Sequence, residues 1–454
     1  NDEKYTAIAV RSIVKDSNQN YRNNADLMND VAPLVDKYLD NFNVHYAGNP
    51  YITGAVPEII KSDASKLILS GLFIMILLLY LNIRNVKAVL MILLVIVLSL
   101  VSMNGFMGWM FYITQNTIFN FTMISTSMPI VLLTIANSDG VHVVTHFFKQ
   151  LRHEQDNRIA INSTMKAMGL PIFLTSLTTI IAFLAMFYAP ITQLMGYGIV
   201  VSFGIFWAWF LSNSLLPSML FLSRWDLKAN FISKLGFLEK FINNIGNIIF
   251  HYPRRTLLLG LSFVLLGLVG ISFLKVEVNI IKFFKPENSI RQSTEFVDQN
   301  FGGTMSLLMR VNGDMDSPKT LNRISEIQNY IERHPEVKMT ASLSDLIKEA
   351  HKTLYNDDDF YSIPDSLNQV RNLLFMLPKE QKISFVNTTT YKTGMVHTYL
   401  TSLSTDEIVT ISNDIENYID QTSNGQLKIE TSGLMIILKD FISMIIESSI
   451  ISIS

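Results

Sequence analysis

The stretch AVLMILLVIVLSLVSMNGFMGWMF, residues 88–111, runs for twenty-four residues without an acidic or basic side chain. As a helix it would rise about 36 Å, at about 1.5 Å per residue. The hydrocarbon core of a bilayer is about 30 Å thick, and about 20 apolar residues cross it as a helix. This stretch therefore predicts a membrane-spanning helix.

Outward from this stretch, similar apolar runs occur at residues 67–83, 118–148, 169–189, 194–222, 256–274 and 434–454. The first is short, and Lys439, Asp440 and Glu447 interrupt the last. Charged residues make up 16% of the 454 residues, against about 25% in typical soluble domains. Any one run could be a core helix of a soluble protein, but the set predicts six spans and a marginal seventh.

Charge and composition exclude several classes of protein. Lys and Arg number 36 against 38 Asp and Glu, a formal net charge of −2, whereas nucleic-acid-binding domains carry a basic excess. The absence of cysteine excludes disulfides, zinc–thiolate sites and a cysteine nucleophile. No Gly-x-x-x-x-Gly-Lys-Ser/Thr loop for ATP occurs. We expect a membrane protein that is not an enzyme and uses neither cofactor nor metal.

The distribution of lysine and arginine predicts the orientation. Cytoplasmic loops are enriched in these residues, and they follow the first, third and fifth spans. The charges are Arg84 and Lys87, then Lys149, Arg152, Arg158 and Lys166, then Arg224, Lys228, Lys234, Lys240, Arg254 and Arg255. The turns at 112–117 and 190–193 carry none. Residues 1–64 and 276–432 are thus expected outside a bacterial inner membrane, facing the periplasm or cell exterior.

This pattern divides the chain into six segments. The first half of the chain holds the end of a first extracytoplasmic α+β domain (1–64) and a five-span bundle (65–222). An interfacial amphipathic connector helix (223–254) and the sixth span (255–275) follow. The rest of the chain holds a second extracytoplasmic α+β domain (276–432) and the start of a second bundle (433–454). Alternating patterns predict strands at 5–14, 43–47, 276–281, 305–312, 382–388, 395–402 and 427–431. Helical periodicity predicts helices at 25–41, 289–300, 318–334, 364–376 and 405–420.

An internal repeat emerges from this order. A strand, a helix and a strand precede Thr53-Gly54 and an apolar run, and the same sequence of elements precedes Ser432-Gly433 and the last run. Such parallel duplications are common in transporters. The chain begins in polar sequence and stops inside an apolar run, so we expect a fragment whose second copy is cut short.

The third span carries three ionisable residues, Asp139, His142 and His146. Their i, i+3, i+7 spacing places them on one helix face. Ionisable groups inside a membrane are costly and usually face the bundle interior or a water-filled path, and an imidazole can relay protons. We expect these residues to couple proton movement to work. Alternatively, they lie near the cytoplasmic end and meet headgroup water, or form a metal site, which the scattered remaining histidines disfavour.

Other residues in the spans predict packing devices or hinges. Pro129 is expected to kink the third span. Gly204, Ala208 and Ser212 recur at four-residue spacing in the fifth span, which lets helices approach closely.

The arrangement resembles the RND superfamily, specifically the branch of predicted lipid exporters related to the mycobacterial membrane protein large (MMPL) and patched-like families. The resemblance rests on residues 136–147, where an acid precedes a histidine, on Thr178-Thr179 and Leu216-Pro217, and on 276–303 with Pro286 and Phe301-Gly302-Gly303. Many relatives place the acid four residues before the histidine, where this chain has Ser138. The resemblance implies an RND-type helical bundle of twelve spans, six to seven of them present, with ferredoxin-like α+β extracytoplasmic domains.

The resemblance also implies a function: proton-driven export of lipids or other hydrophobic molecules. Two alternatives stay open. The five-span bundle also resembles sterol-sensing domains, which suits a non-transporting lipid or sterol sensor. An accessory subunit of protein export would use the same fold and proton logic. Expected partners are hydrophobic or lipid cargo and the membrane, without nucleic acid, and self-association is left open.

Overall fold

The computed structural model describes residues 5–8, 20–39, 41–122, 124–225, 245–273, 277–422 and 427–453. The chain divides into two compact units. The first, which we call the mixed unit, comprises Asn1–Val56 and Lys275–Ser443. The second, the bundle unit, comprises Pro57–Leu274 and Met444–Ser454. Each is described separately below.

Six helices among the described residues are long and apolar enough to cross a membrane, which confirms the six predicted spans. They are α2 (Asn49–Ile83), α3 (Val86–Thr114), α4 (Met128–Glu154), α5 (Asn157–Leu184), α6 (Thr192–Leu222) and α9 (Pro253–Ile271). Helices α3 to α6 pack against one another, and Leu79 and Ile83 of α2 join their core. The marginal seventh run forms helix α17 (Leu434–Ile453), which is not among the six.

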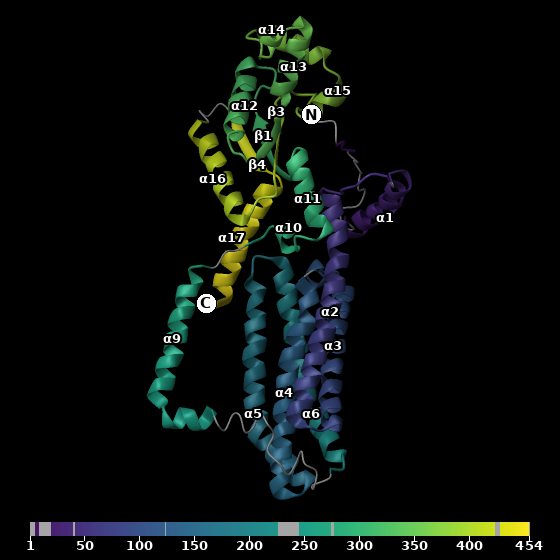
Figure 1. Cartoon of the computed structure of the whole chain (residues 1–454), viewed down its shortest axis with the longest axis vertical. Coiled ribbons are helices and arrows are strands. Elements are labelled where there is room, and N and C mark those ends of the chain that lie inside the picture. The colour runs from purple at the N-terminus through teal and green to yellow at the C-terminus, as the bar shows by residue number, and fades with distance from the viewer. Residues whose placement is uncertain are drawn as a thin grey trace. The chain divides into compact units, whose positions relative to one another are not determined.

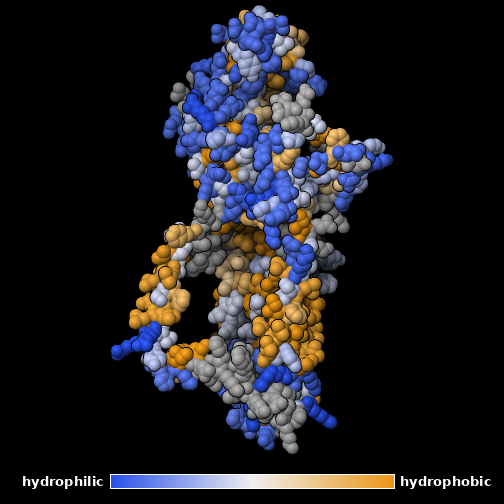
Figure 2. Space-filling model, viewed as in Figure 1, coloured by the Kyte–Doolittle hydropathy of each residue, from blue (hydrophilic) through white to orange (hydrophobic). Residues whose placement is uncertain are grey.

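Many large apolar side chains lie on the outer surface of the bundle unit. Ile92, Met103, Leu132, Phe147 and Leu216 are fully buried between the helices, yet no span has more than half of its apolar window buried. Figure 2 shows the resulting hydrophobic surface along these helices. Helices that are apolar all round need an apolar solvent, so the bundle unit has the surface of a membrane protein.

The third span begins later than predicted. A short 3₁₀ helix, η2 (Thr117–Phe119), comes first, and a second one, η3 (Ile124–Ser127), leads into α4. Pro129 lies in the first turn of α4 rather than in its interior. Within α4 Pro129 removes no intrahelical hydrogen bond, because it lies in the first turn. The kink of the third span stays a prediction, and its place would be the change from η3 to α4.

The mixed unit contains a four-stranded sheet of β1 (Met305–Asn312), β2 (Val337–Ala341), β3 (Thr393–Leu400) and β4 (Lys428–Ser432). The strand order is β2-β3-β1-β4, and every neighbouring pair is antiparallel. Alternate residues of β1 and β3 are buried, as expected where one face of a sheet is covered.

Helices complete the mixed unit (Figure 1). Helix α12 (Pro318–Ile331) connects β1 to β2, and α16 (Thr405–Thr422) connects β3 to β4. Tyr330 of α12 stacks on Tyr418 of α16, with 3.6 Å between the ring centroids, so the two helices lie side by side. The β2–β3 connection holds α13 (Leu343–Tyr355), η5 (Asp358–Phe360), α14 (Leu367–Met376) and α15 (Lys379–Lys382). The remaining helices are α1 (Asn20–Tyr38), α10 (Ile280–Phe283) and α11 (Ser289–Asn300).

The predicted strands of the mixed unit are partly correct. The strands at 305–312, 395–402 and 427–431 are confirmed as β1, β3 and β4. The five predicted helices are present, 289–300 with the predicted ends and the other four with shifted ends. Residues 43–47 are irregular, 280–283 are helical, and 382–388 contain no strand beyond the isolated bridge Val386–Gly394, so these three strand predictions are wrong. Of the strand predicted at 5–14, residues 5–8 are irregular. Residues 9–14 and most of the predicted connector, 226–244, lie outside the described residues, and 245–251 are helical.

A glycine with positive φ comes directly before each of two long helices. Gly48 has φ 105° before α2, and Gly433 has φ 100° before α17. A left-handed residue at this point favours glycine. Gly48 and Gly433 thus occupy the same kind of position, one residue before a long helix, whereas Gly54, the predicted match of Gly433, lies inside α2.

Candidate functional site

Asp139 lies inside the packed core of the bundle unit. Only 5% of the residue is exposed, and the Ser176 hydroxyl on α5 donates a hydrogen bond of 3.2 Å to Asp139 Oδ2. The next residue, Gly140, allows α3 to approach closely, since a Cβ there would lie 3.0 Å from Ile92 Cγ2. Ala136 and Val143, one turn on either side, are fully buried. Asp139 is therefore enclosed by protein rather than lipid.

No lysine, arginine or histidine of the described residues forms an ion pair with Asp139. A carboxylate buried in a membrane bundle is costly unless it is paired. One hydroxyl donor meets part of its hydrogen-bonding capacity, because a carboxylate has about four acceptor sites. Because Asp139 is buried with one hydrogen-bond donor and no paired cation, we regard it as a candidate functional residue rather than as half of a structural salt bridge.

The two histidines of the same helix face have different surroundings. His146 Nδ1 lies 3.4 Å from the Thr164 hydroxyl of α5, whereas His142 is exposed and has no side-chain hydrogen bond within the described ranges. Asp139 and His146 thus both contact α5, about 10 Å apart along α4 at about 1.5 Å per residue. The three residues do not converge on one point, and in the described part of the chain no three His, Asp or Glu side chains could hold a metal ion.

Ser176 was not predicted as a site residue. The nearby hydroxyls of Thr175 and Thr179 donate to carbonyls of their own helix, those of Ile172 and Thr175. Ser176 is one residue further than Thr175, about 100° around the helix, and faces Asp139. Sequence alone offers no way to choose among adjacent hydroxyls in this part of α5, where Thr175, Ser176, Thr178 and Thr179 follow one another closely.

Two apolar cavities flank this site. One of about 390 Å³ lies among α3, α5 and α6 and is lined by Ser176, Ser202 and Trp209 among aliphatic and aromatic side chains. The other, about 470 Å³, lies between α2 and α4 and includes Asn82, Thr134 and Asn137. Mostly apolar cavities with a few polar groups are typical of small-molecule sites. Because Ser176 lines the first cavity, Asp139 is one side chain away from a space for hydrophobic molecules.

The predicted small-residue positions lie where α6 meets α3 and α4. A Cβ on Gly204 would lie 2.9 Å from Met103 Sδ and 3.2 Å from Leu132 Cδ2. Ala208 is fully buried, and the buried Ser212 hydroxyl has no hydrogen-bond partner within the described residues. These positions form a close helix contact, as small residues do in membrane bundles.

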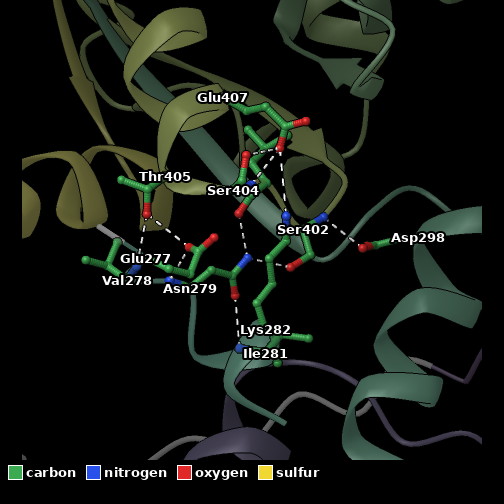
Figure 3. Close-up of polar contacts among 11 residues, drawn as sticks. Glu277, Val278, Asn279, Ile281, Lys282, Asp298, Ser402, Ser404, Thr405 and Glu407 are labelled. Atoms are coloured by element: carbon green, nitrogen blue, oxygen red, sulfur yellow. Dashed lines mark hydrogen bonds and ion pairs between the residues drawn. The ribbon is translucent and has the colours of Figure 1, made fainter. Parts of the chain in front are cut away.

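The mixed unit contains a second polar cluster, centred on Asn279 (Figure 3). Asn279 is 3% exposed, and its amide donates to Ser402 Oγ at 2.7 Å and to the Leu403 carbonyl at 2.6 Å. Thr405 Oγ1 accepts from the Val278 N–H at 2.9 Å and donates to Glu277 Oε1 at 3.0 Å. Residues 277–282, which follow α9 in the chain, are thereby fixed to the turn between β3 and α16.

Two acids at this cluster respond oppositely to their surroundings. Burial raises the pKa of Asp298, although hydrogen bonds from the Ser402 N–H and from Thr304 lower it. Hydrogen bonds from the Ser404 hydroxyl and N–H, both 2.6 Å, lower the pKa of Glu407. Both carboxylates act here as acceptors that hold the turn in place. The cluster was not predicted, because residues 276–281 have the composition of a strand, although Glu277 and Asn279 interrupt an otherwise apolar run.

A model of the MMPL family matches residues 2–237. No curated protein matches the chain. Among solved structures, the chain is similar to the hedgehog release protein Disp from the water bear Hypsibius dujardini, with a TM-score of 0.55 and 12% sequence identity. The match covers 89% of this chain and 53% of that chain. The chain thus spans about half the length of that structure's chain, and at this identity the likeness is one of fold.

Proposed function

The chain belongs to the MMPL family, and on this basis we propose that it is part of an RND-type, proton-driven exporter of lipids or other hydrophobic molecules in a bacterial inner membrane. The six candidate spans and their apolar surface support a place in the bilayer. The apolar cavities support hydrophobic cargo.

The observation that carries this proposal is the environment of Asp139. It is an acid in the core of a candidate membrane bundle, with a serine as its partner and no cation paired to it among the described residues. A carboxylate with such surroundings can change charge without breaking a salt bridge. A proton-driven machine requires such a group.

The contact with Ser176 suggests how protonation would act. The carboxylate accepts the serine hydrogen bond, whereas a protonated carboxyl can donate instead. The change would reorient a side chain that also lines the cavity among α3, α5 and α6. His142 and His146 lie further along α4 toward Lys149 and Arg152, and we propose that they pass protons between Asp139 and that end of the helix. We propose that Pro129, Gly204 and Ala208 maintain the close helix packing around Asp139.

The mixed unit fits the same proposal. The strand order β2-β3-β1-β4, with α12 and α16 as connections, supports a ferredoxin-like domain. The lysine and arginine distribution supports an extracytoplasmic position for residues 276–432 and for 1–64. We propose that these two segments face the periplasm or cell exterior and receive cargo there.

The test replaces Asp139 by asparagine in the full-length protein, reconstituted in vesicles with fluorescent lipid and an imposed pH gradient. Asn keeps the size and an acceptor for Ser176 but cannot titrate, so gradient-driven lipid movement should stop while folding persists by size-exclusion chromatography. Ser138→Asn, at an exposed neighbouring position, is the control and should retain activity. Unimpaired gradient-driven export by Asp139→Asn would remove Asp139 from the mechanism.

A lipid-sensing regulator is the second candidate, and the cavity between α2 and α4 favours it. This cavity contains Asn137, whose Oδ1 is buried and has no hydrogen-bond partner within the described residues. A sensor needs a lipid site but no titrating acid. Lipid that co-purifies equally with the wild type and with Asp139→Asn, without gradient-driven movement in either, would favour the sensor.

A further inference from the structure

Helix α16 holds the segment that follows α9 in the chain. At its first turn Thr405 bonds Glu277 and the Val278 N–H, and Glu407 lies 4.0 Å from Lys282 Nζ (Figure 3). Thr405 and Asn279 are 5% and 3% exposed. Buried hydrogen bonds are expensive to break without replacement, so this end of α16 and residues 277–282 form one attachment.

A second attachment lies further along the same helix. Glu416 Oε2 accepts from Lys439 Nζ at 2.5 Å, and Glu416 Oε1 accepts from the Thr431 hydroxyl at 3.3 Å. Lys439 belongs to the second turn of α17. Its side chain is 21% exposed and that of Glu416 is 34% exposed. The start of α17 is therefore fixed to α16 about 16 Å from the first attachment, at about 1.5 Å per residue.

Between these attachments α16 is fastened to the rest of the mixed unit. Its apolar face is buried through Ile408, Ile411, Ile415 and Ile419. On its polar face, Asp414 accepts a hydrogen bond of 2.9 Å from the hydroxyl of Tyr330, which lies in α12. Asp414 also lies 3.1 Å from Nε2 of His334, which follows α12. A helix packed on one face and bonded along the other moves as a rigid body.

We propose that α16 is the positioning element that makes residues 277–282 and the start of α17 move together. Its contacts are made by Thr405 at one end and by Glu416 with Lys439 at the other, and Asn279 fixes the same segment to the turn that leads into α16. A displacement of the chain after α9 would then reach α17 through this helix. The inference rests on the proposed function, since such a link has a use only if the helices change position during export.

The first test measures the attachment without reference to transport. In the full-length protein, Lys439→Met keeps most of the side-chain length but removes the charge. Amide hydrogens of residues 435–443 should exchange about fivefold faster, because local opening becomes easier when a partly buried ion pair is lost. The reversed pair, Glu416→Lys with Lys439→Glu, should restore slow exchange. Lys428→Met, which removes an exposed pair with Glu430, is the matched control and should leave this segment unchanged.

The second test concerns motion. These 454 residues contain no cysteine, so in a full-length protein whose cysteines elsewhere are replaced by serine, Glu416→Cys with Lys439→Cys can be joined selectively by a short bismaleimide. The linked protein should export lipid at the wild-type rate, because the link replaces the lost ion pair, whereas the same protein before linking should be slower. Asn279→Ala and Lys439→Met should each lower the maximal rate at least threefold without changing the half-saturating lipid concentration. A purely structural loss would instead lower the amount of folded protein at an unchanged rate per molecule.

The outcomes separate the two ideas. Export blocked by the link would show that α16 and α17 must part, and unchanged exchange in Lys439→Met would show that the pair fastens nothing; either result overturns the inference. If the unmodified protein moves no lipid under any gradient, the proposed function fails, and the exchange experiment still decides whether α16 holds α17.

Discussion

The substitution Gly198→Ala should destabilise the bundle unit, although it adds only one methyl group. An ideal Cβ on Gly198 would lie 2.3 Å from the Phe183 carbonyl oxygen and 2.9 Å from Met186 Cβ. Phe183 lies in the last turn of α5 and Met186 in η4 (Ala185–Tyr188). The obstructing oxygen belongs to a backbone, which cannot rotate away as a side chain can.

The magnitude follows from two opposing effects. Alanine gains about 1 kcal/mol of helix propensity over glycine. To restore van der Waals contact, α5 and α6 must separate by about 1 Å, and overpacking of a tight core costs typically about 1–3 kcal/mol, more where the backbone has to move. We expect a net loss of about 2 kcal/mol in the free energy of unfolding.

Two other glycines provide matched controls. At Gly204 the nearest atoms are Met103 Sδ at 2.9 Å and Met103 Cγ at 3.0 Å, parts of a flexible side chain, so Gly204→Ala should change stability by about 1 kcal/mol or less. At Gly105 a Cβ would meet nothing within 4 Å, and Gly105→Ala should be neutral or stabilising. Thermal unfolding in detergent, followed by tryptophan fluorescence and size-exclusion chromatography, would rank the three. Equal stability of Gly198→Ala and Gly105→Ala would refute the tight α5–α6 contact.

Two further predictions concern the mixed unit. Burial raises the pKa of Asp298 in the folded protein, so the folded state binds this proton more tightly than the unfolded chain does. The protonated carboxyl therefore contributes to the free energy of unfolding. This contribution is complete below the ordinary aspartate pKa and is lost as the pH rises through the higher pKa of the folded state. Asp298→Asn should remove that fall from a series of urea unfolding curves, and an unchanged pH slope would count against it. Gly433→Ala places a Cβ 2.7 Å from the Ser306 carbonyl oxygen at a φ of 100° and should lower the free energy of unfolding by about 2 kcal/mol. Gly260→Ala, with open space around the added Cβ, is the control and should not lower it. Equal melting temperatures for the two variants would contradict this prediction.

The sequence predicts the spans well because the decisive quantity, the length of an apolar run, is local. The strands β1, β3 and β4 alternate apolar and polar residues and could also be predicted. Strand β2 could not, because it is a short edge strand in which Lys338, Met339 and Thr340 show no clear alternation and no deep burial. The irregular 43–47 segment shows the reverse: a strand-like composition that finds no pairing partner in the described structure.

The candidate site was only half predictable. Asp139 is conspicuous because an acid in an apolar run violates the local pattern. Its partner Ser176 is inconspicuous, since a serine is ordinary in a membrane helix and its role depends on which face of α5 meets α4. Asn279 was absorbed into a predicted strand, because only the folded chain brings it to Ser402, more than a hundred residues away in sequence.

Helix α9 differs from the other candidate spans in that none of its residues is buried. Its nineteen residues span about 28 Å at about 1.5 Å per residue, slightly less than the average hydrocarbon thickness of about 30 Å. The longer α3 and α6 can adapt to a thicker bilayer by tilting less, whereas α9 has no spare length and depends on local thinning of the lipids or on snorkelling of its flanking residues. The position of α9 should therefore be more sensitive to acyl-chain length than that of the other spans. Reconstitution in phosphatidylcholines of graded chain length would reveal this sensitivity.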